Sequence, residues 1–164
     1  MSINTLLAGP VLRRMQSERI TLWLATSQPV QWRLALFPDK HDSQVHEIRG
    51  HCRALKVAEH YYIHLIDLPL NMPLPADTWV GYELSYKHGA DGEWINLTQE
   101  APHLLYPGKS TLGFVIQSQI RSVLHGSCRK PHYARKEGSS AGDGLVRADQ
   151  HLLELANTPT EWPA

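Results

Sequence analysis

Apolar and polar residues alternate through much of the first two thirds of the chain, and this is the period of a strand with one buried face. In the segment 20–25, Ile20, Leu22 and Leu24 share one face. The segments 30–37 and 79–86 alternate in the same way, and turn-forming clusters at 38–42 and 89–92 follow them. Short strands separated by turns, with little helical periodicity before Gly142, predict an antiparallel β-sandwich.

Further strands are expected where shorter apolar runs occur, at 11–14, 44–49, one or two within 55–68, 94–97 and 111–117. The sequence Leu74-Pro75-x-x-x-Trp79 precedes an alternating aromatic strand and resembles the corner motif of fibronectin type III domains. Trp79 stands where tyrosine is usual in that motif. The expected fold is mainly β, a fibronectin type III/immunoglobulin-like antiparallel sandwich.

The end of the chain has a different pattern. An apolar strand at 121–124 leads into Gly126-Ser127-Cys128 and a loop rich in Lys, Arg, Gly and Ser. Asp143 can cap a helix over 144–157, whose apolar stripe consists of Leu145, Ala148, Leu152 and Leu155. Strand, glycine turn, loop and amphipathic helix form the opening unit of an α/β domain. We therefore expect two domains, a sandwich over 1–120 and a truncated α/β segment with one C-terminal helix over 121–164.

Composition excludes several classes of partner. Lys+Arg and Asp+Glu number 16 each, so the chain has no polybasic signature for nucleic acid or for an anionic membrane. No apolar run approaches the ~20 residues that a membrane helix needs. Arg13-Arg14 is not followed by the apolar segment of an export signal, so we expect a cytoplasmic protein with two free thiols, Cys52 and Cys128.

The sandwich pattern, followed by LHGSCRKPH at 124–132 and GDGLVRADQHLLE at 142–154, resembles the N-terminal portion of the bacterial PhoD-like alkaline phosphatase family. Members of that family are metallophosphoesterases that use iron and calcium or a related metal set. The resemblance implies that Cys128 is a thiolate metal ligand and that the other ligands lie in downstream motifs that this sequence does not contain. The chain by itself is then expected to have no catalytic residues and no activity, and its expected partner is a catalytic domain encoded downstream.

The residues around Cys128 also allow other interpretations. His125-x-x-Cys128-x-x-x-His132 offers three ligands for zinc, although structural zinc sites usually have four. Arg129 and Lys130 could contact phosphate, but two cations in a loop are also ordinary solvated charge, and no phosphate-binding residue can be assigned. Cys52 is expected to be a small buried side chain, and the ten histidines mostly surface or hydrogen-bonded residues.

Two other interpretations of the chain stay open. The chain could be a free-standing fibronectin-like binding module that uses some of its tryptophans, namely Trp23, Trp32, Trp79 and Trp94, although burial is the expected fate of most of them. It could also be a product with no present function. The sequence gives neither a substrate nor an oligomeric state.

Overall fold

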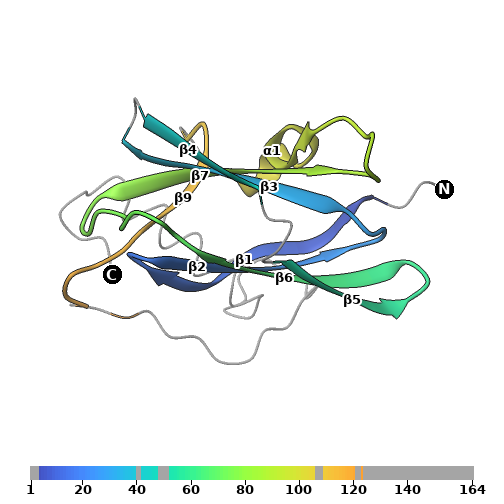
Figure 1. The fold of residues 1–164 in the computed structure, drawn as a ribbon, viewed down its shortest axis with the longest axis horizontal. Helices are drawn as coiled ribbons and strands as arrows, with labels where there is room; N and C mark the ends of the chain where they lie inside the picture. Colours follow the sequence, from blue (N-terminus) through green and yellow to red (C-terminus); the bar gives the residue numbers. More distant parts are fainter. Residues whose placement is uncertain (1–3, 40–41, 48–51, 106–108, 121–122, 124–164) are drawn as a thin grey trace, which may run out of the picture. The chain divides into compact units, whose positions relative to one another are not determined.

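The computed structural model describes residues 4–39, 42–47, 52–105, 109–120 and 123, and the fold is built from two antiparallel sheets (Figure 1). Sheet A has four strands, in the spatial order β1 (Leu6–Gln16), β2 (Arg19–Thr26), β6 (Tyr61–Pro69) and β5 (Cys52–Ala58). The register of β2 on β6 is regular over its whole length. β1 is less regular, because its pairing with β2 shifts at three places.

Sheet B is centred on β7 (Trp79–Lys87), which pairs on one side with β3 (Gln31–Asp39). β3 in turn pairs with β4 (Asp42–Glu47) at the edge of the sheet. On its other side, β7 pairs near its start with β9 (Leu112–Val115) and near its end with β8 (Ile95–Asn96). β9 therefore occupies only half of that edge of β7, and β8 occupies part of the other half.

The strand order defines the class of fold. In chain order, the first, second, sixth and fifth strands form one sheet, and the fourth, third and seventh form the other together with the short β8 and the last strand, β9, which both pair with β7. This is the arrangement of an immunoglobulin-like sandwich, in which the strands named A, B, E and D face a sheet that contains C, F and G. The mainly-β sandwich expected from the alternating pattern is confirmed.

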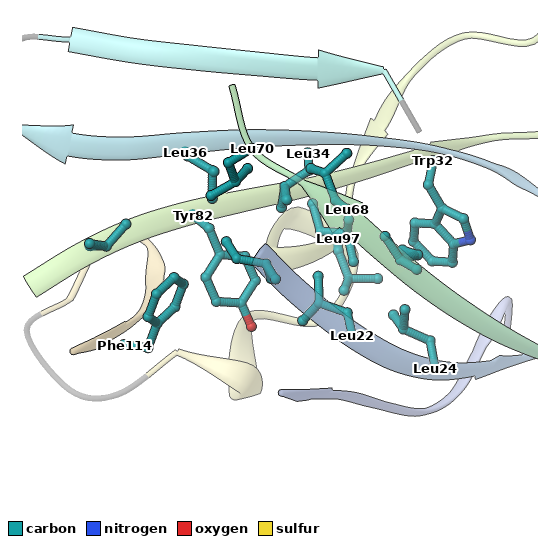
Figure 2. Packing of buried hydrophobic residues seen from close by; sticks show 14 of the residues in the cluster. Leu22, Leu24, Trp32, Leu34, Leu36, Leu68, Leu70, Tyr82, Leu97 and Phe114 are labelled. Atoms are coloured by element: carbon teal, nitrogen blue, oxygen red, sulfur yellow. The ribbon is translucent and has the colours of Figure 1, made fainter. Parts of the chain in front are cut away.

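The core consists of the inward-facing residues of both sheets, which meet between the layers (Figure 2). Sheet A contributes Ile20, Leu22 and Leu24, and all three are at most 1% exposed. Every second residue of sheet B's two central strands is also buried: Trp32, Leu34 and Leu36 on β3, and Val80, Tyr82, Leu84 and Tyr86 on β7. Antiparallel strands whose faces alternate between core and solvent produce this pattern.

The segment between β8 and β9 differs from the expected strand at 94–97. Only Ile95 and Asn96 pair with β7, and the chain then turns into the short helix α1 (Leu97–Glu100), followed by the 3-10 turn η1 (Pro102–Leu104). Asn96 caps the helix because its side-chain oxygen accepts hydrogen bonds from the Thr98 amide and hydroxyl. Leu97 is fully buried, so this segment contributes to the core beside β7.

A sharp corner precedes β7 at the predicted fibronectin-like motif. Leu74 is buried, and Asp77 adopts a left-handed backbone conformation with φ of 57°. The Asp77 amide donates to the carbonyl of Ile116 at 2.7 Å, and its carboxylate accepts from the amide and hydroxyl of Ser118. The corner therefore holds the chain where it leaves β9.

The described sandwich belongs to a unit that extends to Ser118. The expected helix over 144–157 and almost all of the expected second domain, 121–164, lie outside the described residues. In the described part of the chain, no helix is long and apolar enough to cross a membrane.

Candidate functional site

The residue predicted to ligate metal, Cys128, lies outside the described residues, as do the candidate zinc ligands His125 and His132 and the candidate phosphate contacts Arg129 and Lys130. Their roles therefore stay predictions. Within residues 4–39, 42–47, 52–105 and 109–120, no group of three or more His, Cys, Asp or Glu side chains is placed to hold a metal ion.

The sandwich brings a cysteine and a histidine together. Cys52 begins β5, and its sulfur lies 3.8 Å from Nδ1 of His64 in the neighbouring strand β6. The other ring nitrogen of His64, Nε2, lies 2.8 Å from the Thr26 hydroxyl at the end of β2. His64 and Thr26 are both 0% exposed. Trp32 contacts the imidazole ring from sheet B, with the ring centroids 5.5 Å apart and the planes nearly perpendicular.

Hydrogen-bond counting fixes the protons in this cluster. The Thr26 hydroxyl has one proton and donates it to the carbonyl of Gln28 at 2.6 Å. Toward His64 the hydroxyl must therefore accept, so Nε2 carries the imidazole proton. Nδ1 is then the acceptor of the neutral ring, and the Cys52 thiol donates to it.

Burial favours the same neutral pair. Desolvation lowers the pKa of His64 to about 4 and raises the pKa of the Cys52 thiol to about 11. A reactive cysteine requires the opposite shift, because the thiolate is the nucleophile. The arrangement resembles a Cys–His dyad in outline, but at neutral pH it is a hydrogen-bonded structural pair. His64 agrees with the expectation of hydrogen-bonded histidines, whereas Cys52, which the sequence predicts to be buried, is half-buried.

The tryptophans proposed for partner binding are exposed to different degrees. Only Trp32 is buried, at 3% exposed, whereas Trp23 and Trp94 are half-buried and Trp79 is 39% exposed. The expectation that most of the four are buried is therefore wrong. Strand alternation explains the difference, because Trp23 and Trp79 occupy outward positions on β2 and β7.

The partly exposed rings of Trp79 and Trp94 already have partners. The Lys109 ammonium lies 4.7 Å from the centre of the Trp79 ring, and that ring covers Gly113, where an added Cβ would lie 2.2 Å from it. The Trp94 ring is contacted by the Arg33 guanidinium at 4.4 Å and the Lys87 ammonium at 5.2 Å. Cation–π contacts of this kind stabilise the packing of the rings and leave less aromatic surface for a ligand.

A cavity of about 290 Å³ lies between the start of β1 and the segment from Glu100 to Leu104. Its polar side chains include Glu100, whose carboxylate accepts a hydrogen bond from the Tyr86 hydroxyl, and His103. Sequence reasoning did not identify these residues as candidates, because they come from a short helix and turn that no periodic pattern indicated. The carboxylate is already engaged with Tyr86, and the cavity contains no second acid or cysteine.

The strand order thus establishes the sandwich class, whereas the site predicted from sequence lies outside the described residues. No model of a known protein family matches this chain, and a search of curated proteins finds no match either. The PhoD-like family therefore stays an inference from the residues that carry the resemblance.

Proposed function

We propose that this chain is the N-terminal portion of a PhoD-like metal-dependent phosphatase, with the sandwich as an accessory domain and residues 121–164 as the start of the catalytic domain. One observation carries the proposal. An immunoglobulin-like sandwich is followed closely by the segment His125-Gly126-Ser127-Cys128, whose cysteine lies ten residues after the sandwich unit ends at Ser118. That order of domain and motif is the one the resemblance implies.

The chemistry of phosphate ester hydrolysis supports a site whose metal ligands come partly from this chain and partly from a further catalytic segment. A dinuclear metal site neutralises the phosphate charge and generates hydroxide, and it needs several carboxylate, imidazole or thiolate ligands. In the described sandwich, the nearest approach to such a set is the pair Cys52 and His64, in which a neutral thiol faces a buried neutral imidazole. In this proposal, Cys128 supplies one thiolate, and iron and calcium are bound only when downstream segments supply the remaining ligands.

The experiment has two arms and uses p-nitrophenyl phosphate as substrate. The purified chain of 164 residues is assayed alone with Fe³⁺ and Ca²⁺, and again after co-expression with the polypeptide encoded after codon 164. We expect no hydrolysis above the metal-only background in the first arm and metal-dependent hydrolysis in the second. Metal-dependent turnover by the chain alone, or a downstream region without acidic and histidine ligand motifs, would refute the proposal.

A further inference from the structure

Part of the outer face of sheet A is apolar. Buried residues of β6 alternate with Ile63 and Leu65, which face away from the core. Cross-strand partners share a face, so the register places Ala25 and Leu55 beside Ile63, and Trp23 beside Leu65. Val11 of β1 lies opposite Trp23 and extends this second row. Of these residues, Leu55, Leu65 and Val11 are exposed, whereas Ile63 and Trp23 are half-buried and Ala25 is buried. Partly exposed apolar surface of this kind is typical of an interaction site.

The row Ala25–Ile63–Leu55 ends at an open strand edge. In the described part of the chain, β5 pairs only with β6, so its other edge has backbone donors and acceptors with no strand opposite. Leu55 is 62% exposed there, and the adjacent Val57 is 52% exposed. The most apolar row of the outer face is therefore continuous with an unpaired edge.

The two edges of sheet A differ in how well they are protected from pairing. β1 has three register shifts and contains Pro10, which are features that discourage the addition of another strand, whereas both edges carry two charged residues. β5 pairs regularly with β6 from Cys52 to Lys56 and has its single register shift at the far end. β5 contains neither proline nor glycine, so it is the edge suited to pairing.

We propose that β5 pairs antiparallel with β5 of a second copy of this chain, about a twofold axis at Leu55. This register places Leu55 opposite its own copy, Arg53 opposite Val57 and Ala54 opposite Lys56. No two like charges face each other, and like charges directly opposite would destabilise the pair. The contact is isologous, as a twofold interface requires.

The choice of register follows from the apolar row. With the axis at Leu55, the row becomes Ala25–Ile63–Leu55 followed by the same three residues of the second copy in reverse order, in one eight-stranded sheet. An axis at Ala54 would place Arg53 beside Leu55 and interrupt the row with a charge. A face-to-face contact would not satisfy the open backbone edge of β5. The second copy at Leu55 therefore accounts for both the apolar row, which is exposed at Leu55, and the open edge.

A register-specific cross-link tests this directly in the full chain. In a Cys128→Ser background, Leu55→Cys places one cysteine from each copy directly opposite at the twofold axis, within the roughly 7 Å between Cα atoms that a disulfide allows. Arg53→Cys is the matched control, because two copies of residue 53 would lie four residues apart, roughly 13 Å along the strands. We expect Leu55→Cys to form a cross-linked dimer about tenfold or more faster than Arg53→Cys.

Sedimentation of the wild-type chain gives a second, independent measurement. We expect a concentration-dependent dimer that Leu55→Glu converts to monomer, because two carboxylates would face each other at the axis. Met72→Glu, at a 55% exposed position outside the strands, should leave the dimer intact. A wild-type chain that stays monomeric, a dimer that survives Leu55→Glu, or equal cross-linking at positions 53 and 55 would overturn the proposal. None of these results depends on phosphatase activity.

Discussion

The Cys52 thiol donates a hydrogen bond to Nδ1 of His64, and the Thr26 hydroxyl fixes that direction by accepting from the opposite side of the ring. The contact links the side chains of β5 and β6, and it places a neutral imidazole against Trp32 of the other sheet. Ionising the imidazole would place a charge on a fully buried side chain, which is costly. The pair therefore makes the stability of the sandwich sensitive to pH.

We expect the free energy of unfolding to fall as the pH drops from about 6.5 to about 4, the pKa of His64 when folded. The unfolded chain binds a proton at this histidine in that window and the folded chain does not, so stability is present above pH 6.5 and is lost below it. The full effect is up to roughly 3 kcal/mol for a difference of this size. Urea unfolding at pH 7 and pH 4.5 measures it, and His64→Gln should lose much of the decrease; an unchanged decrease would contradict the assignment.

The Cys52 thiol should be slow to react in the folded chain. In a Cys128→Ser variant, Cys52 is the only cysteine, and its pKa of about 11 lies two units above its ordinary value of 9.0. At pH 8, two units reduce the thiolate fraction about 100-fold. We therefore expect iodoacetamide to modify the native variant at least about 100-fold more slowly than the urea-unfolded variant. Equal rates would show that the thiol is exposed or activated.

The core between the sheets should depend on Leu22 much more than on a leucine at the surface. Leu22 is 0% exposed and faces sheet B, whereas Leu7 on β1 is 41% exposed. We expect Leu22→Ala to lower the free energy of unfolding by about 2–5 kcal/mol, since it removes buried apolar area and leaves a cavity. Leu7→Ala should cost less than about 1 kcal/mol. Chemical denaturation of both variants provides the comparison, and similar losses would contradict the two-layer core.

The Asp77 side chain should anchor the end of β9. Its carboxylate accepts from the Ser118 amide at 2.9 Å and also from the Ser118 hydroxyl. Asp77→Ala removes both bonds and places alanine at φ of 57°, so we expect a loss of about 1–2 kcal/mol. Asp77→Asn tolerates that backbone conformation and keeps one acceptor, so it should lose less. Hydrogen exchange at residues 114–118 should accelerate in Asp77→Ala, and unchanged exchange there would contradict the anchor.

Sequence alternation predicted the sandwich because each strand buries every second residue, as at Ile20, Leu22 and Leu24. It could not predict α1, because a four-residue helix is too short to show a period, and its cap at Asn96 resembles an ordinary turn. Sequence alternation could not predict the contact between Cys52 and His64 either. That contact depends on how β5 and β6 pair, and the sequence does not specify the register of two strands before they meet.

The candidate sites also differ in whether the sequence alone could reveal them. A local motif such as Gly126-Ser127-Cys128 can be found in the sequence, and it carries the proposed family. The apolar row that ends at Leu55 could not be found there, because its members come from β2, β6 and β5 and meet only through cross-strand register. Taken one by one in the sequence, these residues do not indicate an interaction surface; they do so only when the fold places them on one face.

The most direct test of the proposed function is metal-dependent hydrolysis of p-nitrophenyl phosphate by the co-expressed assembly of this chain with its downstream catalytic segment, measured for two cysteine variants. Cys128→Ser removes the proposed thiolate ligand, and Cys52→Ser is the matched control in the sandwich. We predict that Cys128→Ser abolishes bound iron and hydrolysis, while Cys52→Ser retains both. Equal activity and equal iron content in the two variants would contradict the account.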